Sequence, residues 1–232
     1  MKYLLLTLFP ILLLPSCSDL EEDVTGNLTE DNYFQDEENL NIFIQQSYNP
    51  MAFFADLGSI FGMQELSSDE AVLPQRGFDW GNPQWRHLHQ HTYQPIHSSI
   101  VQRAWQLSYF AINEINRTIK VVENAKTDLP IQGAIAELKV LRALFYYWLM
   151  DLYGNVPIVV DYEESITQPN SERADVFNFI ESEILQNLDF LDKRVDIKTY
   201  GKINFYVAQT LLAKLYLNAE IYNGESEWLK AI

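Results

Sequence analysis

The chain of 232 residues is poor in cysteine, in basic residues and in β-strand patterns. It has one cysteine, 16 basic residues against 32 acidic ones, and few segments with the two-residue alternation of β-strands. A single cysteine excludes a disulfide framework and a metal site built from several thiolates. The formal net charge of −16 argues against nucleic acid and against electrostatic docking on anionic lipid. Neutral or cationic ligands remain, and the scarcity of strand signals favours a helical protein.

Motifs that carry common chemistries are also missing. The sequence has no glycine-rich phosphate loop, no Walker-type lysine and no nucleophile elbow around Ser98 or Ser99. Asp69 and Glu70 are adjacent acids that could suggest a glycosidase, but that chemistry needs two carboxylates facing each other across the scissile bond. Neighbours in sequence usually point apart, so we interpret the pair as structural, capping a turn. We predict that the chain is not an enzyme and has no cofactor.

The N-terminus predicts export. A weakly basic start is followed by an apolar run, LLLTLFPILLLPS, that is too short to span a bilayer stably, and Cys17 follows directly. Residues 1–16 are therefore predicted to be a signal peptide. Leu14, Pro15 and Ser16 before Cys17 resemble the lipobox of bacterial lipoproteins, which implies that Cys17 is the lipidated first residue of the mature protein. The alternative is an ordinary signal peptide with an incidental cysteine.

Residues 17–35 are acidic and poor in large apolar groups, which is typical of a solvated tether between a lipid anchor and a fold. An acidic run directly after a lipidated cysteine resembles the surface-export signal of Bacteroidetes lipoproteins. We therefore expect a lipid-anchored protein exposed on the outer face of the outer membrane.

Residues 36–232 are predicted to form one all-α domain, because 47% hydrophobic and 13% aromatic residues suffice for one substantial core. Apolar residues recur at steps of three and four, as on one face of a helix. From Leu144 the pattern is apolar nearly all round, so that helix should lie between neighbours. The predicted helices cover residues 36–46, 95–125, 130–154, 173–193 and 204–224, the last capped by Asn204. In the fourth of these, Glu181, Glu183 and Asp192 are expected to face away from the apolar stripe.

A weak repeat signal accompanies these helices. Gly154 and Gly224, each at a predicted helix end, lie about 70 residues apart, close to two periods of a 34-residue helix-pair repeat. Ala136, Val140 and Ala143 fit the small, large, small spacing of a tetratricopeptide helix. Near the last residue, Ser226 could cap another helix that has room for less than two turns. We therefore expect the helical domain to be truncated.

Five segments in order carry a resemblance to a known family: ELSSDEAVLPQRGFDW, LHQHTYQP, RALFYYWLMDLYGNVPIV, SERADVFNFIESEI and YGKINFYVAQTLLAKLYLNA. Together with the lipobox they resemble the N-terminal half of the SusD/RagB family of outer-membrane nutrient-binding lipoproteins, from Cys17 to the last residue. The resemblance implies a tetratricopeptide-containing scaffold at the cell surface that caps a SusC-type TonB-dependent transporter and captures oligosaccharides for import. Family chains are considerably longer, and their C-terminal half supplies much of the ligand-binding surface.

All four histidines lie between residues 85 and 97. In an extended segment His87, His89 and His91 would share a face and could coordinate zinc, yet neither an HExxH helix nor a cysteine partner supports this. The resemblance implies a structural role in leading into the long helix that follows. We expect no metal, and interpret partly buried His89 and His91 as neutral imidazoles that satisfy backbone groups.

The loop QRGFDWGNPQWRHL, residues 75–88, has the composition of a sugar-binding surface. Sugar rings stack their C–H faces on exposed aromatic rings flanked by hydrogen-bonding groups. Trp80 is the favoured platform and Trp85 the second, because Trp85 abuts the histidine segment. In the alternative, both rings fold back onto the core. The candidate glycan-binding residues are Arg76, Asp79, Trp80, Asn82 and Trp85.

Arg142, Tyr146 and Tyr147 stand on an otherwise apolar helix. We interpret Arg142 as a core arginine bonded to backbone or to an acid, with tyrosine packed beside it. Two further functions stay open: a helical-repeat lipoprotein that acts only as a scaffold for protein partners, and, ranked last, a secreted hydrolase.

Overall fold

The computed structural model describes residues 34–78, 83–92, 94, 99–163 and 168–232. Across these ranges the chain is helical without a strand, and an isolated β-bridge joins Val156 to Ser171. The predicted all-α class is therefore confirmed. Within the same ranges, no helix combines the length and the apolar character needed to cross a membrane. The elements are α2 (Glu37–Gln45), η1 (Gln46–Phe53), α3 (Ile60–Leu66), α4 (Gln84–His89), α5 (Ser99–Glu123), α6 (Gln132–Tyr153), α7 (Arg173–Asn187), η2 (Leu188–Phe190), α8 (Phe205–Leu217), α9 (Ala219–Tyr222) and η3 (Trp228–Ala231), where η denotes a 3₁₀-helix.

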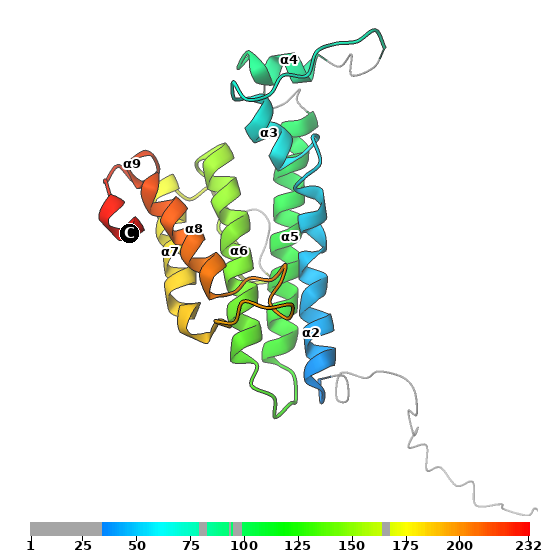
Figure 1. Ribbon diagram of the computed structural model, residues 1–232, viewed down its shortest axis with the longest axis vertical. Helices are drawn as coiled ribbons and strands as arrows, with labels where there is room; N and C mark the ends of the chain where they lie inside the picture. Colours follow the sequence, from blue (N-terminus) through cyan, green and yellow to red (C-terminus); the bar gives the residue numbers. More distant parts are fainter. Residues whose placement is uncertain (1–33, 79–82, 93, 95–98, 164–167) are drawn as a thin grey trace, which may run out of the picture.

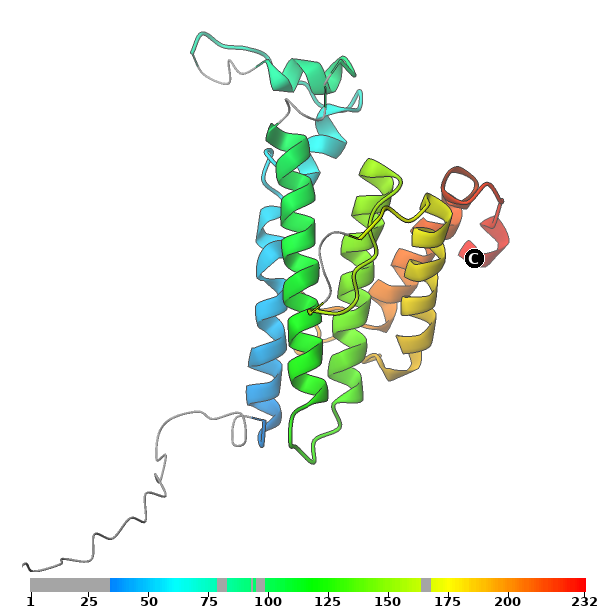
Figure 2. The same cartoon turned by 180° about the vertical axis from the view of Figure 1, so that it is seen from behind.

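Helix α6 lies between α5 and α7, and α2 lies on the far side of α5 (Figure 1). Helix α8 packs against both α6 and α7 on one face of that pair. Consecutive long helices run in opposite directions, as the view from behind also shows (Figure 2). Helices α3 and α4 lie together at the end of α5 where that helix begins. The loop predicted to hold sugar therefore lies at one end of the helical body.

Helix α2 begins where its sequence predicts. Asp36 caps it by accepting a hydrogen bond from the amide of Glu38 at 2.9 Å, and two glutamates in the first turn suit the positive end of the helix dipole. The boundary predicted for the tether is wrong by two residues. Phe34 is buried, its carbonyl accepts from Thr127 Oγ1, and Gln35 donates to the carbonyl of Lys126.

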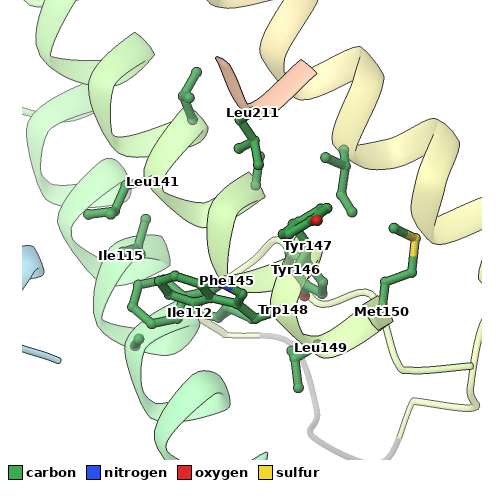
Figure 3. Close-up of a cluster of buried hydrophobic side chains, with 14 of the residues drawn as sticks. Ile112, Ile115, Leu141, Phe145, Tyr146, Tyr147, Trp148, Leu149, Met150 and Leu211 are labelled. Atoms are coloured by element: carbon green, nitrogen blue, oxygen red, sulfur yellow. The ribbon is translucent and has the colours of Figure 1, made fainter. Parts of the chain in front are cut away.

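Helices α5 and α6 form the centre of the core. In α5 the apolar residues at steps of three and four are buried except for partly exposed Leu107; they are Ile100, Ala104, Ala111, Ile115, Ile119 and Val122. Figure 3 shows Ile112 and Ile115 of α5 near Leu141 and Phe145 of α6, with Leu211 of α8 on another side of α6. The small residues Ala136 and Ala143 are fully buried, which allows helices to approach closely. As predicted, α6 lies between neighbours.

Gly154 ends α6 for a steric reason. Its φ is +77°, and its amide donates to the carbonyl of Met150 at 3.0 Å. A Cβ at this position would lie 2.8 Å from Arg173 Nη2, the flexible end of a side chain that can shift, so the positive φ is what favours glycine.

The last two predicted helices are shorter than expected. Asn204 caps α8 as predicted, since its side chain accepts from the amides of Tyr206 and Val207 at 3.1 and 3.0 Å. The helix breaks at Asn218, whose side chain donates to the Lys214 carbonyl at 3.0 Å and so competes with the helical ladder. Helix α7 likewise ends at Asn187, which donates to Glu183 O at 2.7 Å. Ser226 is exposed and caps nothing; Glu227 precedes η3 instead.

Candidate functional site

The acidic pair in the loop after α3 does not form a catalytic arrangement. Asp69 and Glu70 are both exposed. The turn is held by Ser68, whose hydroxyl donates to Glu65 O at 2.8 Å and accepts from the Glu70 amide at 3.1 Å. The two acids were predicted to cap this turn, and that detail is wrong because the shorter serine side chain reaches the backbone groups.

Two of the five residues predicted to bind sugar, Arg76 and Trp85, lie in the part of the chain that the structure describes. Arg76 is exposed, next to Gly77, whose φ of +60° fits the turn predicted there. The expected exposure is wrong for Trp85, which is only 7% exposed. Trp85 and Leu88 share one face of α4, which contacts α3, so burying the indole ring removes a large apolar surface from water. Asp79, Trp80 and Asn82 lie outside the described residues.

The histidines do not lie on an extended segment, as the zinc alternative requires. His87 and His89 belong to helix α4, and His91 follows it with a φ of +52°. His87 Nδ1 lies 2.8 Å from Thr92 Oγ1. In the described part of the chain, no group of three or more histidine, cysteine, aspartate or glutamate side chains is arranged to hold a metal ion. His97 lies outside that part.

The structural interpretation of two histidines is also wrong in detail. His91 is exposed, and the Nδ1 atom of half-buried His89 has no hydrogen-bond partner among the described residues. Neither satisfies a backbone group, because the helical turn of α4 already satisfies its own amides and carbonyls.

Arg142 forms a buried polar cluster, as predicted. Its Nε and Nη2 each donate to the Glu183 carboxylate at 2.9 Å, and Nη1 donates to Asn116 Oδ1 at 2.7 Å and to Val160 O at 3.2 Å. Burial raises the pKa of the Glu183 carboxyl, and attraction to Arg142 only partly offsets that rise. Glu183 was predicted to face away from the packed side of α7, and this is wrong because it neutralises the arginine.

The cluster fixes the segment after α6. Tyr146 OH donates to Val159 O at 3.0 Å and accepts from the Val159 amide at 2.7 Å. Asn116 Nδ2 donates to the same carbonyl at 3.0 Å, and Tyr109 donates to Pro157 O at 2.7 Å. The polar side chains of α5 and α6 thus form hydrogen bonds with backbone groups of a segment that has no strand partner over most of its length. Their role is structural.

Sequence reasoning missed a groove of about 1190 Å³ between α2, the start of α6 and the connector of residues 188–203. In Figure 1 the connector, drawn in orange, crosses α6 towards α5 and α2. The groove floor includes Glu137, whose Oε1 accepts from Tyr48 OH at 2.6 Å; Tyr48 OH in turn accepts from the Ile203 amide at 2.9 Å. Burial raises the pKa of Glu137. A signal existed in the aromatic and charged residues of the connector, of which residues 188–193 were predicted as the end of a helix and 194–203 only as a gap between helices.

Helix α8 and the residues after it leave an apolar face open in the described structure. The exposed side chains on this face are Tyr206, Val207, Leu217 and Ile221. Exposed apolar patches of this kind are typical of surfaces that contact other protein segments.

Comparison with known proteins identifies the family. A family model described as starch-binding and associating with the outer membrane matches residues 71–208, more than half of the chain. The chain belongs to the SusD-like family. A SusD-like protein of Bacteroides ovatus is 25% identical over 223 residues, which are 92% of this chain and 38% of that protein. The family description names binding and no reaction, in agreement with the prediction that the chain is not an enzyme.

Solved structures share the SusD-type fold. A SusD homologue of Bacteroides thetaiotaomicron aligns with a TM-score of 0.71 and 22% identity, covering 87% of this chain and 40% of that one. A structure described as a laminarin-binding SusD-like protein aligns with a TM-score of 0.68 and 20% identity, covering 81% of this chain and 41% of that one. The chain thus spans about two fifths of the length of these relatives.

Proposed function

We propose that the protein is a cell-surface lipoprotein that captures oligosaccharides and delivers them to a SusC-type TonB-dependent transporter for import. The observation that carries the proposal is the family match over residues 71–208, described as starch-binding and associating with the outer membrane. A laminarin-binding protein of the same fold adds support, because its ligand is also a glucan. The acidic composition agrees with an uncharged ligand.

Within the chain, we assign the first sugar contacts to the loop of residues 75–82. Arg76 is exposed there, and Phe78 beside it is fully exposed. Trp80 supplies the stacking ring in this proposal, with Asp79 and Asn82 as hydrogen-bonding neighbours. Trp85 instead anchors the loop to α3 and α4, since its ring is buried.

The test is Trp80→Ala, measured by calorimetric titration with maltoheptaose and laminarihexaose. We expect a loss of about 1 kcal/mol in binding free energy, roughly fivefold in Kd, with an unchanged melting temperature, because one aromatic platform is removed. Trp228→Ala is the matched control: this tryptophan is 58% exposed and lies on η3, far along the chain from the loop. Unchanged affinity in Trp80→Ala, or equal losses in both variants, would contradict the assignment.

Membrane attachment is proposed through Cys17, which lies outside the described residues. Two or three acyl chains suffice for stable anchoring, where one would be marginal. We expect Cys17→Ala to release the protein from the outer-membrane fraction. Ser16→Ala is the control because it keeps the thiol. If Cys17→Ala left the protein in that fraction and open to external protease, the anchor would be wrong.

The alternative function is that of a scaffold for protein partners alone. The exposed apolar face of α8 and α9 is the observation that favours it. The two functions differ in one measurement, the retention of the protein on immobilised starch and laminarin. A protein that is retained by neither polysaccharide but still copurifies with the transporter would support the scaffold.

A further inference from the structure

The geometry points to a second oligosaccharide site, in the groove between α2, the start of α6 and the connector of residues 188–203, that takes an uncharged glycan. This inference rests on the proposed function for the class of its ligand, but it concerns different residues from the loop of residues 75–82. Size, exposed rings, bonding groups and charge support it independently.

The groove has the size for a ligand of several sugar rings. Its volume of about 1190 Å³ exceeds the roughly 300–1,000 Å³ of common small-molecule pockets. Its apolar wall comes from Ile42 of α2 and Ile197 of the connector, which are both exposed, while Leu40, Ile44, Leu191 and Ile203 are buried behind it. A wall of this kind accepts the C–H faces of sugars while the rest of the groove stays polar.

Two aromatic rings line the groove and are open to solvent. Phe190, at the end of η2, is 56% exposed, and Tyr200, on the connector, is 84% exposed. Fully packed aromatics would have no face left for a ligand, whereas these rings can stack on sugar at little cost in conformational freedom. Phenylalanine in this position has no hydrogen bond to gain from water, so its exposure favours a partner.

Hydrogen-bonding groups also line the groove. Lys202 Nζ donates to Asn41 Oδ1 at 3.3 Å, which joins the connector to α2. Tyr48 bonds one carboxylate oxygen of Glu137, Oε1, and among the described residues no hydrogen bond reaches Oε2. Glu137 is partly buried, so a donor at Oε2 would be favourable, and sugar hydroxyls are suitable donors.

The charges of the groove select against anions. Five carboxylates line it, against three cations, Arg194, Lys198 and Lys202; the acids are Asp36, Glu37, Glu38, Glu137 and Asp192. This balance disfavours uronic-acid or sulfated glycans, and it also disfavours the acidic segment of residues 18–32 as an occupant.

A cationic peptide is the competing ligand, and the bonding pattern disfavours it. Three of the five carboxylates already have partners. Asp192 pairs with Arg194, Asp36 caps α2, and Glu137 bonds Tyr48. Among the described residues a lysine or arginine side chain would therefore find only Glu37, Glu38 and the Oε2 atom of Glu137 available, whereas a neutral hydroxyl can also share an oxygen that already accepts a hydrogen bond.

The connector is held in place before any ligand arrives. Thr199 Oγ1 bonds the carbonyls of Arg194 and Asp196 at 3.0 and 3.2 Å, and the Phe205 amide donates to Asp192 O at 3.0 Å. With the Tyr48 bond to Ile203, both ends of the connector are fixed. A preformed groove binds without the entropy cost of ordering a loop.

The test is hydrogen exchange of the full chain with and without maltoheptaose or laminarihexaose. We expect protection in residues 36–45 and 188–203, in addition to the loop of residues 75–82. In the double variant Phe190→Ala/Tyr200→Ala, the ligand concentration that gives half-maximal protection of the groove should rise about fivefold to tenfold. Protection of the loop should not change. Phe110→Ala/Tyr206→Ala is the matched control, since these rings are 55% and 48% exposed and line no part of the groove.

The outcomes separate the two proposals. Protection of the loop alone overturns the groove and leaves the proposed function standing. Protection of the groove that persists in Trp80→Ala supports the groove even if the loop assignment fails. Protection of neither region contradicts both proposals. Binding of oligogalacturonate in the groove would contradict the proposed preference for uncharged glycans. Groove protection by a lysine-rich peptide and by neither sugar would overturn the glycan as its ligand.

Discussion

Helices α6 and α8 have similar compositions but different surroundings. Both are rich in leucine, alanine and aromatic residues, and α8 also carries Gln209, Thr210 and Lys214 on its exposed side. Helix α6 packs against α5, α7, α8 and η2, so residues all around it are buried. Helix α8 is covered mainly by α7 and η3, and Tyr206, Val207 and Leu217 remain exposed. In the described structure α6 therefore follows the rule that a helix apolar nearly all round lies inside a core, whereas α8 leaves apolar side chains exposed beside polar ones.

The largest effect is expected from a substitution in the buried helix, α6. Arg142→Ala removes the charge that balances buried Glu183 and leaves Asn116 Oδ1 and Val160 O without their donor. We expect a loss of about 3–5 kcal/mol in the free energy of unfolding, measured by urea denaturation. Arg117→Ala is the control, because its ion pair with Glu114 is partly open to solvent and should matter by about 1 kcal/mol or less. Similar losses in both variants would mean that the Arg142 cluster contributes no more than a surface pair.

The second prediction compares the two helices directly through leucine deletions. Leu149→Ala in α6 empties a fully buried site and should cost about 2–5 kcal/mol. Leu217→Ala in α8 removes a side chain that is 59% exposed, and should change stability by about 0.5 kcal/mol or less. Thermal unfolding of both variants checks this. A cost above about 2 kcal/mol for Leu217→Ala would mean that α8 is covered in solution.

The smallest effect on stability is expected at Glu137, which lies on the part of α6 that lines the groove. Burial raises its pKa above the ordinary 4.5, so the folded state holds this proton more tightly than the unfolded chain. The stability that the protonated carboxyl contributes is present below pH 4.5 and is lost as pH rises through the folded-state pKa. In Glu137→Gln this dependence is absent.

The measurement is the difference in unfolding free energy between wild type and Glu137→Gln from pH 4 to 8, which cancels the contributions of other groups. As pH rises, wild type should lose unfolding free energy relative to Glu137→Gln. Asp69→Asn, at an exposed acid, is the control and should give a flat difference. A difference that moves towards wild type with rising pH would show that Glu137 is stabilised as a carboxylate.

Much of the fold was predictable because it depends on local patterns. The period of three and four residues predicted each long helix, and Asn204 and Gly154 marked a start and an end through capping that involves only neighbouring residues. Predictions failed where a distant partner decided the outcome. Glu183 turned inward because Arg142, on another helix, required a counter-charge, and Trp85 is buried because α4 packs on α3. The groove was missed because its walls come from three segments far apart in the chain.

The sequence by itself determined the helical class, the starts of α2 and α8, the end of α6 and the family, because periodicity, caps and ordered motifs are properties of short segments. It also determined the acidic character that favours uncharged ligands. Only the tertiary structure decided which apolar faces are covered and which rings are exposed, since burial depends on what packs against a residue. It likewise brought Glu137, Asn41 and Lys202 together across α6, α2 and the connector, because a groove exists only where separate elements meet.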